Sequence, residues 1–328
     1  MNVGKIRGLQ QISTTEGIFV ICAMDHRGSL RAMIEKEQLE EADYQKLVAH
    51  KLELCAALAP YASAVLLDPN YGAAQCIASG VLPGHTGLLI SIEASGYQSN
   101  SQGRVTTLLN GWDVGKIKRM GASAVKILVY YRPDLAKVAN KQLKTIEMVA
   151  KECLKHDLPF LVEPKTYPVK GESTESPQFA AQKPNLVIET ARQITSLPID
   201  VLKAEFPADL NYETDKAKLL DLCHQLDEAS RVPWVILSAG VDYSAFLEEV
   251  EIACQAGASG FLGGRAIWQE AIRLKNEKER VKFLSTTVAN RLKELSKIAT
   301  KYATPWYHKL GIEAHELVTV PENWYKNY

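Results

Sequence analysis

The chain has 328 residues, of which 46% are hydrophobic and 23% are charged, the balance of an ordinary globular protein. Lysine and arginine together number 38, aspartate and glutamate also number 38, and the formal net charge is zero. This balance gives no electrostatic reason to expect nucleic acid or a membrane surface as a partner, so any anion site must be local.

The six cysteines and the N-terminal residues predict a protein of the cytoplasm. No two cysteines form a C-x-x-C pair, and no cysteine–histidine group has the spacing of a zinc site. Residues 1–11 contain no apolar signal core, and the apolar run of residues 18–24 is too short to span a bilayer. We therefore expect a cytoplasmic protein with no metal site.

Short apolar runs bounded by turn residues, the pattern of buried strands, recur eight times along the chain. They lie at residues 18–24, 64–67, 87–93, 124–130, 159–163, 201–206, 233–238 and 259–263. Helices are expected within residues 2–15 and at about 40–58, 71–79, 114–120, 135–155, 184–195, 215–229 and 243–255. A polar loop is expected at residues 166–183, and irregular aromatic sequence from residue 304 onwards.

Eight strands alternating with helices predict an α/β fold, a single (β/α)8 TIM barrel over residues 1–328. A C-terminal helical and aromatic extension is expected from about residue 275. The main alternative is a doubly wound open sheet. A dinucleotide-binding sheet of that kind carries G-x-G-x-x-G after its first strand, whereas this strand ends in Asp25-His26-Arg27-Gly28. We therefore exclude that form.

Polar side chains gather at the expected carboxyl ends of the strands, where a barrel carries its chemistry. They are Asp25, His26, Asp68, Glu93, Lys126, Glu163, Lys203, Glu205, Ser238 and Arg265. One such residue is usually a satisfied core group or a rim charge. Two lysines and several carboxylates at one mouth are harder to explain by packing, because an unpaired buried charge is unfavourable.

Lys203, inside the apolar run of residues 201–206, has two interpretations. Its stem could pack while its ammonium reaches water, or its amine could lie in a dry pocket. In a dry pocket, burial disfavours the charged form and leaves a nucleophile that can attack a carbonyl to form a Schiff base. In a lysine Schiff-base aldolase, Lys126 would supply a nearby positive charge or a proton, and Glu163 would move protons. This chemistry needs no metal and no cofactor.

Two glycine-containing turns have the character of a phosphate site. Residues 237–241 (Leu-Ser-Ala-Gly-Val) follow the seventh strand, and residues 262–266 (Leu-Gly-Gly-Arg-Ala) follow the eighth. Glycines let backbone N–H groups approach a phosphate, and Arg265 can pair with its oxygens. Phosphate sites after the last two strands are common in this fold, although two glycine turns could also serve only to close a barrel.

The chain resembles the class I tagatose 1,6-bisphosphate aldolase family. The resemblance is carried, in order, by Ala23-Met24-Asp25-His26-Arg27-Gly28-Ser29-Leu30, Val125-Lys126-Ile127-Leu128-Val129-Tyr130-Tyr131, Val201-Leu202-Lys203-Ala204-Glu205, Leu237-Ser238-Ala239-Gly240-Val241 and Gly263-Gly264-Arg265-Ala266-Ile267-Trp268. It implies a barrel enzyme, a carbon–carbon lyase, that reversibly cleaves a ketose bisphosphate to dihydroxyacetone phosphate and glyceraldehyde 3-phosphate. It also implies Lys203 as the Schiff-base residue, with Glu163 and Lys126 beside it.

The same resemblance implies residues that hold the hydroxyls and the ketone-side phosphate of the substrate. They are Asp25, Ser238, Gly240, Gly264 and Arg265, and we expect Asp68 at the same mouth. For the distal group we expect His26, Arg27 and Ser29, unless Arg27 is occupied by a neighbouring carboxylate.

A sister family, the bacterial sulfofructose phosphate aldolases, shares several motifs. Residues 233–238 and 256–262 are similar to that branch, whereas the loop of residues 166–184 is more similar to the tagatose branch. Both relatives usually carry glutamine where this chain has His26. We expect a bisphosphate substrate, with 6-deoxy-6-sulfofructose 1-phosphate, cleaved to dihydroxyacetone phosphate and sulfolactaldehyde, as the alternative.

Two further hypotheses concern activity and assembly. A barrel can keep its phosphate loops and act as a sugar-phosphate sensor without turnover, although the presence of Lys203, Lys126 and Glu163 argues against this. The aromatic C-terminus, with Trp306 and Trp324, either packs on its own barrel or forms a homo-oligomer contact.

Overall fold

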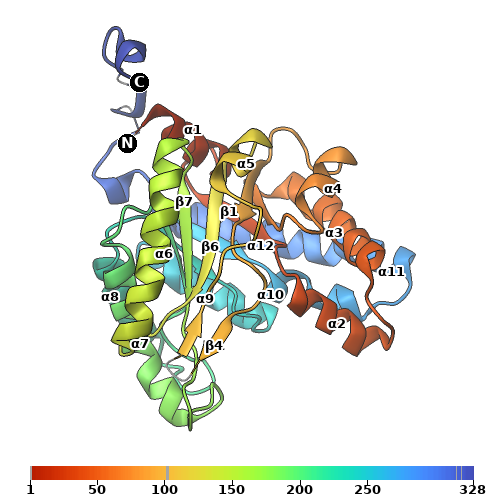
Figure 1. Cartoon of the computed structure of the whole chain (residues 1–328). Coiled ribbons are helices and arrows are strands. Elements are labelled where there is room, and N and C mark those ends of the chain that lie inside the picture. The colour runs from red at the N-terminus through yellow and green to blue at the C-terminus, as the bar shows by residue number, and fades with distance from the viewer. Residues whose placement is uncertain (1, 101–102, 315, 319) are drawn as a thin grey trace.

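Eight parallel strands close into a barrel in the order β1-β10-β9-β8-β7-β6-β3-β2, and helices surround it (Figure 1). The computed structural model describes residues 2–100, 103–314, 316–318 and 320–328. The strands are β1 (Phe19–Ala23), β2 (Ala64–Leu67), β3 (Gly87–Ser91), β6 (Ala124–Tyr130), β7 (Phe160–Lys165), β8 (Val201–Ala204), β9 (Trp234–Leu237) and β10 (Gly260–Gly263). This architecture confirms the predicted (β/α)8 barrel, and β2 and β6 have the predicted bounds.

Helices lie between successive barrel strands, or after the last strand in the case of α10, and cover the outside of the barrel (Figure 1). They are α2 (Gly28–Gln38), α3 (Tyr44–Leu58), α4 (Ala73–Ala78), α5 (Val114–Arg119), α6 (Ala136–Lys155), α7 (Pro177–Ile194), α8 (Lys216–Ala229), α9 (Tyr243–Gln255) and α10 (Arg265–Trp268). None of the helices that the structure describes is long and apolar enough to cross a membrane.

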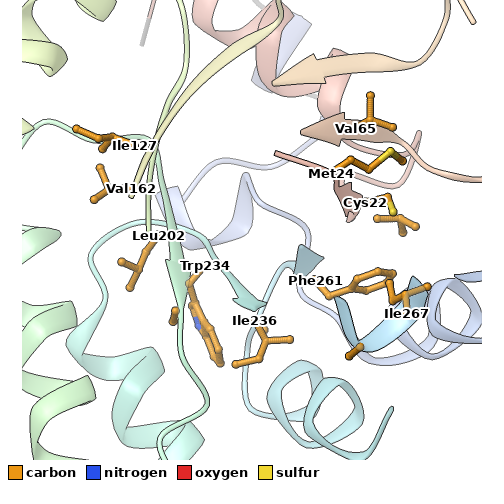
Figure 2. Close-up of a cluster of buried hydrophobic side chains, with 14 of the residues drawn as sticks. Cys22, Met24, Val65, Ile127, Val162, Leu202, Trp234, Ile236, Phe261 and Ile267 are labelled. Atoms are coloured by element: carbon orange, nitrogen blue, oxygen red, sulfur yellow. The ribbon is translucent and has the colours of Figure 1, made fainter. Parts of the chain in front are cut away.

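Alternation along the strands separates two hydrophobic layers, because successive strand side chains point to opposite faces. In β1, Phe19, Ile21 and Ala23 belong to the cluster inside the barrel, whereas Val20 and Cys22 belong to the cluster between strands and helices. Figure 2 shows part of the outer cluster, with side chains from several strands pointing toward the helices. Because the inner face is packed at its base, only the carboxyl ends of the strands leave room for a site.

The amino-terminal end of the barrel is closed by α1 (Val3–Ile12) and by one tryptophan of the C-terminal stretch. Leu9, Ile12 and Trp306 belong to the inner cluster, and Trp306 is 1% exposed. The backbone N–H of Trp306 donates to the Gly17 carbonyl at 3.0 Å. Trp306 therefore packs on its own barrel, as one of the two alternatives for this stretch predicts.

The C-terminal extension runs through η2 (Gln269–Arg273), α11 (Glu277–Phe283), the π-helical η3 (Leu284–Val288) and α12 (Ala289–Tyr302). Arg280 holds α11 to α3 through Nε and Nη2, which donate to the Glu53 carboxylate at 2.6 and 2.8 Å. Three single turns, η4 (His308–Leu310), η5 (Glu316–Val318) and η6 (Trp324–Asn327), follow Trp306. The two chain ends lie close together near α1 (Figure 1), where the Gly4 N–H donates to the Tyr328 hydroxyl at 3.2 Å.

Two helices differ from the sequence-based prediction. The region predicted as one helix at 40–58 begins only at Tyr44, because Asp43 caps it by accepting from the Lys46 N–H, and α2 precedes it. The helix predicted from Pro184 begins at Pro177, because the Ser176 side chain caps it and proline is well placed in a first turn. Pro184 lies inside α7.

A small hairpin of β4 (Gln98–Asn100) and β5 (Gly103–Val105) was not predicted. It follows β3 and precedes α5. Its strands are too short and too polar to give a clear period-two hydrophobic signal.

Candidate active site

Strand alternation explains why three charged side chains face the inside of the barrel. Lys126, Glu163 and Lys203 stand two residues after the inner-cluster residues Ala124, Leu161 and Val201 on β6, β7 and β8. Residues two apart share a face, so the charged side chains point inward above the apolar plug. Because β6, β7 and β8 are adjacent in the barrel, they lie close together at its mouth.

A cavity of about 490 Å³ opens at this mouth. Its lining includes the expected residues Asp25, His26, Arg27, Ser29, Lys126, Glu163, Lys203, Ser238, Gly240, Gly264 and Arg265. The structure thus brings together eleven of the twelve residues predicted for the site, and Asp68 is the exception.

Lys126 is surrounded by three carboxylates. Its Nζ lies 2.8 Å from Asp25 Oδ2 and 2.9 Å from Glu93 Oε1 and Glu163 Oε2, and its side chain is 1% exposed. Burial on its own would lower the pKa of Lys126, but the three negative charges outweigh it and raise that pKa well above its ordinary value. Lys126 is therefore a permanent cation at neutral pH.

Lys203 has a different environment from Lys126. Its Nζ lies 2.9 Å from one carboxylate oxygen, Glu163 Oε2, and its side chain is 5% exposed. Burial lowers the pKa of Lys203; the charge of Glu163 opposes this shift, and the charge of Lys126 reinforces it. The outcome is an amine that loses its proton more easily than an ordinary lysine and opens onto the cavity.

Glu163 contacts both lysines through the same oxygen. Burial would raise the pKa of Glu163, but Lys126 and Lys203 outweigh it and lower that pKa. The pKa of Asp25 is lowered in the same way, with Lys126 as its main partner. Both carboxyls are therefore ionised at neutral pH, and Glu163 can accept a proton from Lys203 or from a molecule in the cavity.

The two glycine turns follow β9 and β10 and contact each other at the mouth of the barrel. The Gly264 N–H donates to Ser238 Oγ at 3.1 Å, and Arg265 Nη2 donates to the Ala239 carbonyl at 3.3 Å. Gly240 has φ +87°, and a Cβ there would lie 3.1 Å from the guanidinium carbon of Arg265. Glycine at this position therefore allows the turn to pass close to the arginine. We call Ser238, Gly240 and Arg265 together the cationic corner.

His26 lies at the mouth as a neutral side chain. Burial lowers the pKa of His26 to about 3, against the opposing charge of Asp25. The ring packs edge-on against Trp268 at 5.2 Å between centroids, and its Cε1 would lie 2.9 Å from a Cβ at Gly264. A neutral ring can donate one hydrogen bond to a bound molecule but adds no positive charge to the site.

Arg27 is largely engaged with the protein. Its Nη2 donates to the Glu93 carbonyl at 2.8 Å, its Nη1 donates to Asn70 Oδ1 at 3.4 Å, and the residue is 9% exposed. The Glu93 carboxylate is 3.9 Å away. Arg27 nonetheless lines the cavity, and Ser29 beside it is exposed.

Asp68 faces away from the cavity, which corrects the expectation that it binds substrate. Its side chain is 0% exposed and its Oδ2 lies 2.7 Å from Lys51 Nζ, on α3. Its Oδ1 accepts from the backbone N–H groups of Asn70 and Tyr71 at 2.9 and 2.8 Å. The carboxylate is thus held by an ion pair with Lys51 and by two backbone N–H groups, and it does not line the cavity.

Three further residues of the site, Glu93, Tyr130 and Lys165, were given no role from the sequence, although Glu93 was placed at the mouth. Glu93 completes the group of carboxylates on Lys126, and its place at the end of the predicted third strand was a usable signal. Tyr130 and Lys165 line the cavity at the ends of β6 and β7, and Lys165 Nζ lies 3.4 Å from Glu205 Oε1. The prediction missed Lys165 because it ended this strand two residues early, at Glu163.

The chemistry that this geometry permits is nucleophilic attack by an amine on a carbonyl, with a carboxylate to move protons. The cationic corner at Arg265 and Gly240 suits one anionic end of a substrate. The three carboxylates converge on Lys126, at the ends of other strands than the turn that carries Arg265.

Comparisons with known proteins agree on one group. Residues 19–270 match the model of the DeoC/LacD family aldolases. A tagatose 1,6-diphosphate aldolase of Streptococcus agalactiae serotype V is 36% identical over 320 residues, which cover 92% of this chain and 97% of the relative.

Two solved structures share the fold. A Schiff base-forming fructose-1,6-bisphosphate aldolase is 20% identical with a TM-score of 0.56 and covers 87% of this chain and 98% of its own. The fructose-bisphosphate aldolase of Plasmodium falciparum is 14% identical with a TM-score of 0.72, over 92% and 95% of the two chains.

Proposed function

The chain belongs to the DeoC/LacD family of aldolases, and from this premise we propose that it cleaves a ketose 1,6-bisphosphate such as tagatose 1,6-bisphosphate. The products would be dihydroxyacetone phosphate and glyceraldehyde 3-phosphate. Membership of an aldolase family makes the chain an enzyme and sets aside the alternative of a non-catalytic sensor. The substrate is supported by the name of the 36% identical relative.

The observation that carries the mechanism is the position of Glu163 Oε2, 2.9 Å from both Lys203 Nζ and Lys126 Nζ. In the proposed reaction the neutral amine of Lys203 attacks the C2 carbonyl and forms a carbinolamine. Loss of water gives an iminium, which draws electrons as the C3–C4 bond breaks. Glu163 accepts the proton of the C4 hydroxyl, the aldehyde leaves, and the remaining enamine is protonated and hydrolysed.

We propose that the ketone-side phosphate binds at the cationic corner formed by Arg265, Gly240 and Ser238. Arg265 supplies charge, and a glycine turn brings backbone N–H groups close to phosphate oxygens. The corner lies at the ends of β9 and β10, and β9 is adjacent to β8, so a phosphate there leaves the next carbon atoms near Lys203. Asp25 and Gly264 line the same cavity and are proposed to hold substrate hydroxyls.

The distal phosphate is proposed to lie near Arg27, Ser29 and His26. The partial occupation of Arg27 by the Glu93 carbonyl leaves fewer free donors there than at the ketone side. This is the end where a phosphate and the sulfonate of 6-deoxy-6-sulfofructose 1-phosphate would differ, because phosphate carries up to about two charges and rewards more cations.

A comparison of kcat/KM tests the substrate. We would measure tagatose 1,6-bisphosphate, fructose 1,6-bisphosphate and 6-deoxy-6-sulfofructose 1-phosphate side by side, each with and without EDTA. The proposal expects cleavage of a bisphosphate, unaffected by the chelator. A preference for the sulfonate of more than about tenfold, roughly 1.4 kcal/mol of transition-state preference, would assign the chain to the sister activity. Absence of cleavage of all three would overturn the proposed function.

We further propose a cytoplasmic enzyme that forms a homo-oligomer. All six cysteines are free and buried, as expected of a reducing compartment. Trp324, Tyr325 and Tyr328 are 39%, 63% and 64% exposed, an unusual aromatic surface for a chain end. Sedimentation of the full chain and of a chain ending at residue 315 at micromolar concentration tests this; a monomer in both cases would contradict it.

A further inference from the structure

Lys51 is a fully buried lysine that does not line the cavity. It lies in the middle of α3, and the residue is 0% exposed. Its ammonium donates to the carbonyl oxygen of Met24 and, at 2.6 Å, to that of His26. Its third neighbour is Asp68 Oδ2 at 2.7 Å. The Lys51 ammonium thus has two backbone carbonyls as hydrogen-bond acceptors and one carboxylate as its ion-pair partner.

The two carbonyls that Lys51 holds flank Asp25. Residues 24–27, which we call the β1 loop, follow β1 and lie outside any helix or strand, although the Met24 N–H still donates to the Leu66 carbonyl of β2 at 2.8 Å. The Asp25 carboxylate reaches the opposite way, into the cavity, where it lies 2.8 Å from Lys126 Nζ. A displacement of either carbonyl would therefore move Asp25 relative to Lys126.

Asp68 fixes Lys51 in turn. Its Oδ1 accepts from two backbone N–H groups in the turn after β2, so the carboxylate cannot swing to follow a displaced ammonium. Lys51 therefore joins the β1 loop to the end of β2. A buried ion pair is weak evidence for stability, because an apolar pair of equal volume is often as stable. The geometry therefore indicates that the Lys51–Asp68 pair orients the β1 loop rather than stabilises the fold.

We propose that Lys51, with Asp68 as its counter-charge, is a positioning residue for the reaction: it clamps the carbonyls of Met24 and His26 and so holds the Asp25 carboxylate against Lys126. Lys51 contacts neither the cavity nor a reacting atom. The proposal rests on the proposed aldolase activity, because its effect is read through turnover.

Loss of the clamp has a consequence that general destabilisation would not have. Lys203 faces the charges of Glu163, Lys126 and Asp25, and the Asp25 charge favours its protonated form. If Asp25 moves away, the pKa of Lys203 falls. The acid limb of the kcat/KM profile, which reports deprotonation of this amine in the free enzyme, then moves to lower pH.

The test uses the double variant Lys51→Met/Asp68→Asn, which removes the ammonium without leaving an unpaired buried carboxylate. The matched control is Lys5→Met/Asp200→Asn. That pair is also buried, with Lys5 Nζ 2.7 Å from Asp200 Oδ2, but Lys5 lies in α1 at the closed end of the barrel. Both double variants remove one ion pair of similar burial. A difference in kcat or pH profile between them therefore reports the effect of where the pair lies in the fold.

We expect kcat of the Lys51→Met/Asp68→Asn variant to fall by about tenfold to hundredfold, because a displaced Asp25 misplaces the substrate hydroxyl that it is proposed to hold. The acid limb should shift to lower pH, which a merely structural role of Lys51 would not produce. The Lys5→Met/Asp200→Asn control should keep both the kcat and the pH profile of the wild type, whatever its loss of thermal stability.

Three outcomes would overturn the proposal. One is a wild-type kcat and pH profile in Lys51→Met/Asp68→Asn. Another is an equal loss in the control, which would indicate general destabilisation. The third is failure of both this variant and Lys51→Met to fold while the control folds, which would make the pair a folding requirement. Failure of the proposed function is distinguishable, because the wild type itself would then cleave none of the substrates.

Discussion

Lys126 and Lys203 are chemically the same side chain, and their surroundings give them different charge states. Lys126 has three carboxylates within 2.9 Å, whereas Lys203 shares one oxygen of Glu163 with it. Each charge acts strongly because both amines are almost fully removed from water. The division of labour between a permanent cation and a nucleophile therefore follows from the number of acidic neighbours.

Replacement of Lys126 by methionine should raise the pKa of Lys203. Lys126 disfavours the protonated form of Lys203, and its removal also leaves the charges of Asp25 and Glu163 to favour that form. The pH midpoint of covalent trapping by cyanoborohydride and dihydroxyacetone phosphate should therefore move upward from the wild-type value. Turnover at neutral pH should fall, because a smaller fraction of Lys203 is then deprotonated.

The measurement is the rate of trapping across pH 6 to 11, taken in parallel for the wild type and Lys126→Met. A midpoint that stays unchanged or moves downward would show that Lys126 does not set the charge state of Lys203.

Replacement of Glu163 by glutamine should separate imine formation from carbon–carbon cleavage. The amide keeps the shape of the side chain but cannot accept a proton, so kcat should fall by about a hundredfold or more. Trapping of dihydroxyacetone phosphate should persist, because the pKa of Lys203 falls when the Glu163 charge is removed. Stopped-flow cleavage and mass-detected trapping measure the two steps; a Glu163→Gln variant that cleaves normally would remove Glu163 from the mechanism.

The residues of the site could be predicted from the sequence where they lie at the end of a recognisable strand. Lys126, Glu163 and Lys203 interrupt apolar runs, and alternation sends them inward. Asp68 ends a predicted strand in the same manner, yet it is turned outward by Lys51, which lies mid-helix in α3. A lysine in a helix is ordinarily a surface residue, so its pairing with Asp68 depends on tertiary packing that the sequence pattern does not contain.

At the scale of elements, the turn after β9 sets the place of Arg265. Gly240 has φ +87° and Gly121, in the turn after α5, has φ +88°. A side chain at Gly240 would meet the Arg265 guanidinium at 3.1 Å, whereas nothing lies within 4 Å of a Cβ at Gly121. The two glycines thus share a backbone conformation and differ in what surrounds them.

Gly240→Ala should therefore raise KM for the phosphorylated substrate by about tenfold through displacement of Arg265, a partial loss of a charged contact. Gly121→Ala carries the same backbone strain, about 1 kcal/mol, and should lower stability without a change in KM. Steady-state kinetics and urea unfolding of both variants provide the comparison. Equal KM values would mean that the turn does not position a phosphate-binding arginine.

The elements themselves were predictable where the hydrophobic pattern is strong. All eight barrel strands were located, and α9 has its predicted bounds. The start of α7 was missed because Pro184 is a typical helix-start residue, while the actual start depends on the Ser176 cap. The β4–β5 hairpin was missed because its pairing carries almost no hydrophobic signal.

At the scale of the whole molecule, one residue far from the site in sequence closes the barrel. Trp306 is 1% exposed at the closed end, whereas Trp324 is 39% exposed near the C-terminus. Trp306→Ala should lower the free energy of unfolding by about 3–5 kcal/mol, the loss typical of a buried aromatic truncation. Trp324→Ala, measured at a concentration low enough to keep the chain monomeric, should stay within about 0.5 kcal/mol of the wild type.

Urea unfolding of the two tryptophan variants checks this difference. Similar unfolding free energies would contradict the assignment of Trp306 as the plug of the barrel.

The account depends most on Lys203 as the residue that forms the covalent intermediate. The direct measurement is borohydride reduction of the enzyme with dihydroxyacetone phosphate, followed by proteolysis and mass spectrometry of the modified peptide. We predict one adduct, on Lys203, and none in Lys203→Arg, which keeps the charge but cannot form the imine. An adduct on Lys126 or Lys165, or turnover by Lys203→Arg, would contradict the account.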